Sequence, residues 1–368
     1  MRGGILKKLL LVDTKGSGHH KNYAELVIES SKEKYNNKIY FIAEYEIENV
    51  KNINLLFTNH DNIILRAVIR VLWILKVFKE AKNNDINHIH FLYLDSLIII
   101  SPFIYLLLCF NFKFEITATL HHFKFEKLKT VFLKLLSKRI RKIVVHGKYL
   151  KDSLKNKSIK NVINIEYPAT HNYFPGKNVA RKLLDLNEKD NILLSLGGTR
   201  KNKGLDILLE ALNYINSKNF LLIIAGKEEH FNKEFILKKI NNYKEKVVLD
   251  LSFISDLKFS LYLEAGDAVI LPYKRDFMGQ SGPLIEGVNH NCFIISSNHG
   301  QIGHTVKNKA LGFVFEENDS KDLSDKIKEF ITNKEKRLKK INNQKYTSFK
   351  NEIDKDKFIF KMQKYIMN

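Results

Sequence analysis

The sequence predicts an α/β protein that is built from two doubly wound domains. Strand-like apolar runs alternate with helical segments, and this alternation stops and restarts near residue 170. The chain also has 368 residues, more than a single hydrophobic core usually supports. Short, nearly all-apolar strands are typical of parallel sheets that helices cover on both faces. We therefore expect one such sheet in each half of the chain.

The first half begins with an apolar strand at 7–13, a turn from Lys15 to Gly18 and a helix over about 21–34. Further strands are expected at 38–43, 88–94, 113–120 and 142–147. The most hydrophobic stretch, 96–112, is shorter than the ~20 residues of a usual membrane-spanning helix and contains Pro102. We interpret it as a buried helix that crosses between parallel strands.

The second half repeats the pattern and ends in a charged helix over about 347–366. Strands are expected at 191–198, 220–227, 247–253, 267–273 and 291–297. We expect no signal peptide, because the apolar run near the start is short and ends at Asp13. Cys109 and Cys292 lie in apolar runs without metal or disulfide spacing, which indicates free thiols in a reducing cytoplasm.

Positive charge is the strongest bulk property of the sequence. The formal net charge is +21, and residues 121–160 contain 13 Lys or Arg against 2 Asp or Glu. This density favours an anionic partner, yet no helix-turn-helix, zinc spacing or aromatic-glycine strand pattern supports nucleic acid. Residues 127–142 interleave apolar and basic side chains, as a helix at a membrane interface would. The alternative is the solvated face of an ordinary amphipathic helix.

A loop that opens into a helix is predicted at 279–286. Pro283 suits the first helical position, and Gly282 would be the N-cap. The free amides of Ser281 and Gly282 would then point toward an anion. Glu286 follows one turn later on the same face, where its carboxylate could accept hydrogen bonds from a sugar diol attached to that anion.

A second loop supplies full positive charge. Arg200 and Lys203 fall between the strand at 191–198 and a helix over about 205–215. In open α/β folds, ligands bind outside the carboxyl ends of the strands, which is where this loop lies. Arg, Lys and a helix N-terminus can together neutralise a diphosphate leaving group. The two loops therefore predict a site for a nucleoside diphosphate.

Four ordered blocks of the C-terminal half resemble glycosyltransferase family 4, whose members are retaining enzymes of the GT-B fold. The blocks are SLGGTRKNKGLDILLEAL, AGDAVILPY, QSGPLIEG, and NHGQIGHTV followed by GFVFEENDSKDLSDKI, and the match runs from about 190 to 335. The resemblance implies two Rossmann-like domains that face a cleft. The expected boundaries are 1–170 for the acceptor domain, 171–346 for the nucleotide-sugar domain and 347–368 for a helix that crosses back to the first domain.

Carried over by position, the resemblance implies specific roles. Catalytic roles fall to His121 near the donor sugar and to Arg200 and Lys203 at the diphosphate. The donor would be bound by Gly16, Gly18, Gly198, Phe253, Ile254, Gln280, Ser281, Gly282 and Glu286, and the acceptor by His19 and His20. No metal or other cofactor is implied. Met278 stands where the family's first glutamate is expected, as in a Gln-Ser-Gly branch of the family that also lacks it, so the donor sugar is not specified.

Two groups of histidines have plainer interpretations. His121 and His122 are adjacent on a strand and point to opposite faces, so one of them at most faces a ligand, and a hydrogen-bonded structural role is the alternative. His88 and His90 alternate on a strand without an evident third ligand. A role at the strand end is favoured over a metal site.

The expected function is transfer of a sugar from a nucleoside diphosphate, with UDP favoured, to a hydroxyl of a cell-surface glycan precursor. The acceptor could be lipid-linked, and the expected location is cytoplasmic, on the inner face of the membrane, where the basic first domain would meet anionic lipid. Two alternatives remain open: a sugar-nucleotide epimerase of similar fold, and a non-catalytic subunit that supports a partner enzyme.

Overall fold

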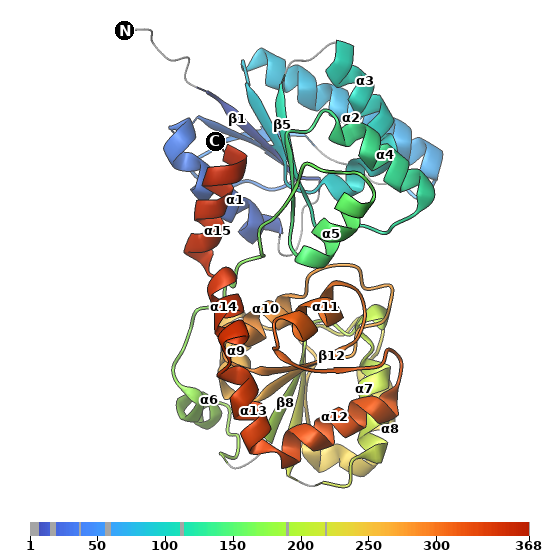
Figure 1. Ribbon diagram of the computed structural model, residues 1–368, viewed down its shortest axis with the longest axis vertical. Coiled ribbons are helices and arrows are strands. Elements are labelled where there is room, and N and C mark those ends of the chain that lie inside the picture. The colour runs from blue at the N-terminus through green and yellow to red at the C-terminus, as the bar shows by residue number, and fades with distance from the viewer. Residues whose placement is uncertain are drawn as a thin grey trace. The chain divides into compact units, whose positions relative to one another are not determined.

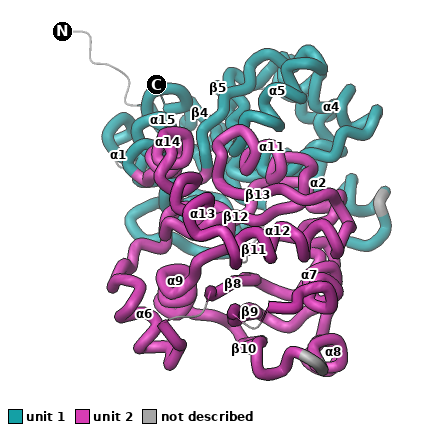
Figure 2. The backbone as a smooth tube through the Cα atoms, turned by 60° about the horizontal axis from the view of Figure 1, so that its bottom comes forward, with its two compact units in different colours: residues 1–166, 356–368 teal, residues 167–355 magenta. Residues whose placement is uncertain are grey.

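The structure is a computed structural model that describes residues 7–14, 20–36, 38–55, 60–110, 114–188, 191–217 and 219–367 (Figure 1). The described residues do not include Gly16, Gly18 and His19, to which the sequence assigned binding roles. The chain divides into two compact units, shown in two colours in Figure 2. Unit 1 contains Met1–Glu166 and Asp356–Asn368, and unit 2 contains Tyr167–Lys355.

Unit 1 is a parallel sheet of seven strands in the order β3-β2-β1-β4-β5-β6-β7. The strands are β1 (Leu9–Val12), β2 (Ile39–Ala43), β3 (Lys51–Asn54), β4 (His88–Phe91), β5 (Glu115–Leu120), β6 (Lys142–Val145) and β7 (Val162–Asn164). The helices are α1 (His20–Tyr35), α2 (Ile63–Asn83), η1 (Leu94–Ile100), α3 (Ser101–Phe110), α4 (Lys127–Ser137), α5 (Lys148–Asn156), α15 (Lys355–Met362) and η5 (Gln363–Met367).

Unit 2 is a parallel sheet of six strands in the order β10-β9-β8-β11-β12-β13. The strands are β8 (Asn191–Leu196), β9 (Phe220–Ala225), β10 (Val247–Asp250), β11 (Ala268–Leu271), β12 (Phe293–Ser297) and β13 (Gly312–Phe315). The helical segments are α6 (Lys177–Leu183), η2 (Lys201–Lys203), α7 (Leu205–Ala211), η3 (Leu212–Tyr214), α8 (Lys233–Lys239), η4 (Asn241–Lys246), α9 (Asp256–Ala265), α10 (Gly282–Asn289), α11 (Gly300–Asn308), α12 (Ser320–Thr332), α13 (Lys334–Ile341) and α14 (Gln344–Glu352).

Helices cover both faces of each sheet, so the predicted α/β class with two doubly wound domains is confirmed (Figure 1). The central strands are apolar along their whole length because both faces are covered: all four residues of β1 and of β11 are buried. The apolar stretch 96–112 lies mostly in η1 and α3, where Leu97 and Ile104 join the core of unit 1. None of the described helices is both long and apolar enough to cross a membrane.

The chain passes between the units at different places from those expected. Residues 167–170 group with unit 2, because the backbone N–H of Thr170 donates to Glu286 Oε1 at 2.8 Å. Residues 347–355 also stay with unit 2, because Phe349 and Ile353 are buried in its core. Only the last part of the expected 347–368 helix, α15 with η5, groups with unit 1, where η5 packs on α1.

Candidate functional site

The candidate donor site lies in unit 2 at the point where the strand order reverses. Strands β8 and β11 are neighbours there, while the chain continues outward on opposite sides of them. The loops that follow two such strands leave a crevice in which ligands of open α/β sheets bind. The two loops meet directly, since Lys274 N donates to Asn202 O at 2.9 Å. A Cβ atom on Gly204 would lie 1.8 Å from Pro272 O, so this contact requires glycine.

Lys203 is the half-buried cation of this site. It ends η2, and its Nζ lies against the backbone at Gly197, where an added Cβ atom would come within 2.3 Å of Nζ. Burial, and then repulsion by Arg200, lower the pKa of Lys203 to about 8 although Glu229 raises it. Arg200 is exposed at the start of η2. The loop thus presents the two positive charges that the sequence predicted; the structure adds that Lys203 is partly desolvated and Arg200 is exposed.

Gly198 has a steric role in the same loop. A Cβ atom at this position would lie 2.2 Å from Glu229 Oε1, so a side chain would displace that carboxylate. The neighbouring Thr199 is buried, and its Oγ1 accepts a hydrogen bond from the Glu229 backbone N–H at 2.8 Å. The loop after β8 is therefore held against the loop after β9 without a bulky side chain at its tip.

Helix α10 begins at the predicted loop, but its N-cap is Ser281 and the expectation of Gly282 was wrong. The Ser281 hydroxyl accepts from the Leu284 backbone N–H at 3.3 Å, and a hydroxyl cap satisfies a helix-end donor that glycine leaves open. Ser281 Oγ also lies 3.2 Å from the Tyr273 hydroxyl, on the loop that follows β11. Pro283 is the second residue of α10, one position later than expected, and still lies in the first turn.

Buried polar atoms without partners gather around these loops. Among the described residues of unit 2, such side-chain atoms belong to Gln280 (Nε2 and Oε1), Asn202 (Oδ1) and Asp206 (Oδ1). Burying an unpaired polar group is unfavourable, and groups of this kind mark places that a ligand or an ordered water completes. Asn202 in η2 and Asp206 in the first turn of α7 were not predicted, because an Asn or Asp at such a position has no distinctive sequence pattern.

Replacing Gln280 with Leu tests whether its amide serves a ligand. Two unpaired buried polar atoms would disappear, so we expect the free energy of unfolding of the unliganded protein to stay equal or rise by about 1 kcal/mol. Donor affinity should fall about tenfold, because amide hydrogen bonds to the donor are lost. Denaturant unfolding and nucleotide titration measure the two quantities. A less stable variant with unchanged donor affinity would show that Gln280 is structural.

Glu286 is buried and faces the start of unit 2. Its Oε1 accepts from the Thr170 backbone N–H and hydroxyl at 2.8 and 3.1 Å, and its Oε2 accepts from the His171 backbone N–H at 3.2 Å. Burial lowers the pKa of His171, but the pairs with Glu286 and Asp256 outweigh this and raise it. A ribose diol would thus have to share this carboxylate with residues 170 and 171.

Phe253 and Ile254 follow β10 in the same unit. The Phe253 side chain is 85% exposed, whereas Ile254 packs against a core cluster of unit 2. An exposed aromatic ring offers a face on which a base could stack. Met278 lies in the loop before α10, so the carboxylate expected at that position is absent from the chain.

In unit 1, His121 lies at the carboxyl end of β5 and is buried among rings. It stacks on Tyr93 with a 4.0 Å centroid separation and lies 4.8 Å from the ring of His146. His121 Nε2 is 3.1 Å from the Leu92 carbonyl oxygen. Burial, and then His146, hold the pKa of His121 well below its usual value, so the ring is neutral. This hydrogen-bonded position of His121 fits the structural role that was the alternative interpretation. Contact with a ligand stays a prediction.

His20 stands at the start of α1 in the same part of unit 1. Its Nδ1 lies 3.1 Å from both carboxylate oxygens of Asp13, which also accepts from the Tyr45 hydroxyl at 2.8 Å. The ring of His20 also stacks on the ring of Tyr93, with a 3.6 Å centroid separation. Asp13 orients His20, and neither this carboxylate nor Tyr93 was predicted. Asp13 and Tyr93 each follow the end of a strand. That position is the signal in the sequence that could have indicated them.

Asp95 is a further polar residue that the sequence did not indicate. Its carboxylate accepts from the His121 backbone N–H at 3.2 Å and also from the backbone N–H of His122. Burial raises its pKa. His122 is exposed, so the expectation that the two histidines point in different directions holds.

His88 and His90 form a buried hydrogen-bonded row. His88 lies between the Tyr35 hydroxyl, at 2.5 Å, and Thr117 Oγ1, at 2.7 Å. His90 contacts Thr117 Oγ1 at 2.8 Å and Thr119 Oγ1 at 3.2 Å. Burial lowers the pKa of both rings, to about 3 in His90. In the part of the chain that the structure describes, no group of three or more His, Cys, Asp or Glu could hold a metal ion.

Comparison with known proteins agrees with this geometry. Residues 177–347 match the family model described as glycosyl transferases group 1. The chain is 28% identical over 156 residues to a glycogen synthase of Thermodesulfovibrio yellowstonii, covering 42% of this chain and 31% of the relative. It is also 28% identical over 207 residues to an uncharacterized glycosyltransferase of Methanocaldococcus jannaschii, covering 56% of this chain and 54% of the relative. The match therefore spans about a third of the length of the glycogen synthase and about half of the length of the second relative.

A solved structure shows the same fold. HepE of Anabaena, in complex with UDP, superposes with a TM-score of 0.75 over 97% of this chain and 98% of its own, at 14% identity. Two doubly wound sheets and this likeness define the fold as GT-B. The matched family model and the two relatives support a glycosyltransferase.

Proposed function

We propose that this chain is a retaining glycosyltransferase of family 4 that uses a UDP-sugar. The carrying observation is the convergence, at one edge of the unit 2 sheet, of half-buried Lys203, the first turn of α10 and the unpartnered amide of Gln280. A desolvated cation and free helix amides suit a diphosphate. HepE of Anabaena forms complexes with UDP and with UDP-glucose, which supports uridine as the base.

Lys203 and Arg200 would act on the leaving group. As the bond between the sugar C1 and the diphosphate oxygen breaks, negative charge grows on that oxygen, and both cations stabilise it. Free N–H groups at the start of α10 add the positive end of a helix dipole. In a retaining reaction, the acceptor oxygen bonds to C1 on the face that the diphosphate leaves, and the departing phosphate oxygen takes the acceptor proton. Positioning and charge then supply most of the rate.

The acceptor is proposed to be a hydroxyl of a cell-surface glycan precursor, free or lipid-linked, at the cytoplasmic face of the membrane. His20 would contact it in unit 1, where Asp13 fixes the orientation of the ring. The donor sugar is left open, because Met278 provides no carboxylate to bind its hydroxyls.

A panel of UDP-, GDP- and ADP-sugars, each with and without glycan acceptors, tests the proposal. We expect release of UDP that an acceptor accelerates, and a product whose anomeric configuration matches that of the donor by NMR. A new UDP-sugar formed without an acceptor would identify an epimerase instead. Failure of every nucleotide to raise the melting temperature would favour a non-catalytic subunit.

A further inference from the structure

The outer surface of unit 1 contains a stripe of apolar side chains where a helix normally has polar ones. On α2, the outward positions Ile64, Val68, Leu72, Lys76 and Lys79 recur every three or four residues and are all exposed. The first three are apolar, and Leu65 beside them is exposed as well. The inward face of α2 is separately filled by buried residues such as Ile74 and Phe78. The exposed stripe therefore does not serve the core of unit 1.

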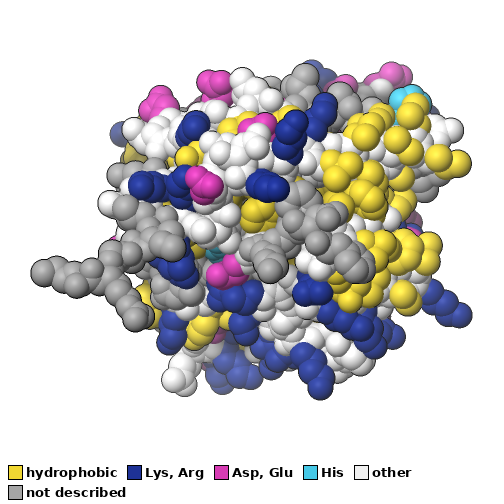
Figure 3. Space-filling model, turned by 90° about the horizontal axis from the view of Figure 1, so that it is seen from above, with side chains coloured by type: hydrophobic (Ala, Val, Ile, Leu, Met, Phe, Trp, Pro, Cys, Tyr) yellow, Lys and Arg dark blue, Asp and Glu magenta, His cyan; other side chains and the backbone are white. Residues whose placement is uncertain are grey.

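The neighbouring helices continue this apolar surface. Helix α3 packs between α2 and α4, with contacts to both. Leu106 on α3, and Leu128 and Val131 on α4, are exposed although α4 buries Leu133 and Leu136 on its other side. Figure 3 shows hydrophobic side chains gathered on the side where these helices lie in Figure 1. Contiguous exposed apolar surface of this kind marks an interaction site.

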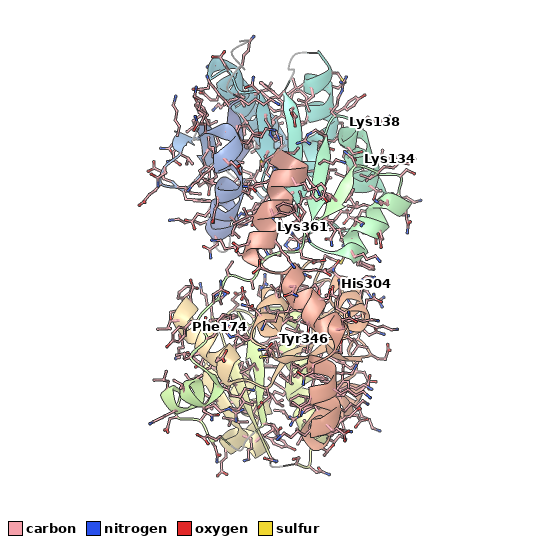
Figure 4. All side chains as sticks on the ribbon, turned by 60° about the vertical axis from the view of Figure 1, so that its left-hand side comes forward. Lys134, Lys138, Phe174, His304, Tyr346 and Lys361 are labelled. Atoms are coloured by element: carbon pink, nitrogen blue, oxygen red, sulfur yellow. The ribbon has the colours of Figure 1, made fainter. Side chains whose placement is uncertain are left out.

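Basic residues border the apolar surface. Lys127, Lys134 and Lys138 share the outward face of α4 with Val131, and the labelled Lys134 and Lys138 lie at the outer edge of unit 1 in Figure 4. On α2, Lys76 and Lys79 occupy the outward positions that follow the apolar stripe. The acidic residue nearest in sequence to α4, Glu126, is paired with Lys129 at 3.0 Å. Asp61, which is exposed just before α2, is outnumbered by these lysines, so the border carries net positive charge. Two copies of this surface facing each other would bring lysines together.

We propose that this surface, formed by α2, α3 and α4, docks unit 1 on an anionic lipid bilayer. Ile64, Val68, Leu72, Leu128 and Val131 enter the boundary between headgroups and acyl chains, and the lysines contact lipid phosphates. Long lysine side chains reach the headgroups while their methylene groups cover apolar surface. The proposal assigns α2 and α3 to the docking surface in addition to the basic segment that the sequence indicated, and it does not depend on the proposed chemistry.

Co-sedimentation with vesicles tests the apolar part without any nucleotide. The full chain should bind vesicles of phosphatidylglycerol mixed with phosphatidylcholine, and Val68→Gln with Leu72→Gln should weaken binding about tenfold or more. Val179→Gln with Leu183→Gln on α6 is the matched control. These residues have the same types and spacing, and their exposures of 50% and 60% resemble the 48% and 54% of the α2 pair. Circular dichroism should show both variants folded.

The charged part has its own comparison. Lys134→Gln with Lys138→Gln should weaken binding to the anionic vesicles, whereas Lys233→Gln with Lys238→Gln on α8 removes the same charge from exposed positions of unit 2 and should not. High salt and pure phosphatidylcholine should both reduce binding. Equal losses in the α2 and α6 variants, or no binding by the wild-type chain, would overturn the proposal. So would a wild-type dimer in sedimentation velocity that the α2 variant converts to monomer without any vesicle binding.

Discussion

Replacing Lys203 with Ala is expected to lower turnover of the UDP-sugar by about 10²–10³-fold. The ammonium group lies desolvated against Gly197, at the edge of the sheet where β8 and β11 diverge. A charge held there needs no rearrangement when the diphosphate begins to leave, so its removal acts mainly on the transition state. The variant should keep its stability, because removing a half-buried cation without an ion-pair partner also removes its desolvation penalty.

Lys201→Ala provides the matched control for this prediction. Lys201 lies two residues earlier in the same turn and is exposed, so its removal should change turnover by less than about threefold. The wild-type kcat/KM should also decline above about pH 8, because the pKa of Lys203 is lowered to about 8 and the cation is lost above it. Full turnover in the Lys203 variant would show that Lys203 does not act in the site.

Acid should destabilise the protein well before its carboxylates titrate. Burial is the main reason that the pKa values of His88, His90, His121 and His146 are lowered, to about 3 in His90 and about 4 in His146. These rings are neutral when folded and take up protons near pH 6.5 when unfolded. Their contribution is therefore present above pH 6.5 and is lost as pH falls below it.

Each such histidine should remove about 1.4 kcal/mol of unfolding free energy at pH 5.5, one unit below the unfolded pKa. His171 opposes this trend, because its raised pKa favours the folded state at low pH. Four rings against one still leave a net loss, which is large beside a typical stability of about 5–15 kcal/mol. Urea unfolding at pH 7.5 and 5.5 measures it.

His90→Gln sharpens that measurement. Glutamine keeps hydrogen-bonding capacity toward Thr117 and Thr119 but does not titrate. The loss of unfolding free energy between pH 7.5 and 5.5 should therefore be smaller by the contribution of one histidine. The slope between the two pH values is informative even if the variant is less stable at both. An unfolding midpoint that is the same at pH 7.5 and 5.5 in the wild-type protein would contradict the conclusion that these four buried histidines are neutral in the folded state.

The periodic apolar strands made most of the fold predictable. Strands such as β1 and β11 are apolar throughout because helices cover both faces of the sheet, and that pattern is visible in the sequence. The edge strand β3, with the sequence KNIN, is half-exposed and was not predicted. The short edge strand β7 was missed for a similar reason. Edge strands depend on tertiary pairing that local sequence does not reveal.

The site was predictable where backbone chemistry determines it. Glycine, proline and serine around α10 indicate a helix start, and Arg200 and Lys203 follow a strand end, so both loops could be anticipated. The pairing of side chains could not be anticipated. Glu286 accepts hydrogen bonds from residues more than a hundred positions away, and Asp95 accepts from two backbone N–H groups that follow another strand. Tertiary contacts alone determine such partners.

The most direct test of the donor site compares the affinities of UDP and uridine by isothermal titration calorimetry. The two ligands differ only in the diphosphate, so the ratio of their dissociation constants measures what the anion-binding loops contribute. The account predicts that UDP binds the wild-type protein at least about a hundredfold more tightly than uridine, and that Lys203→Ala removes most of this difference. Equal affinities of UDP and uridine for the wild-type protein would contradict a diphosphate site at this edge of the unit 2 sheet.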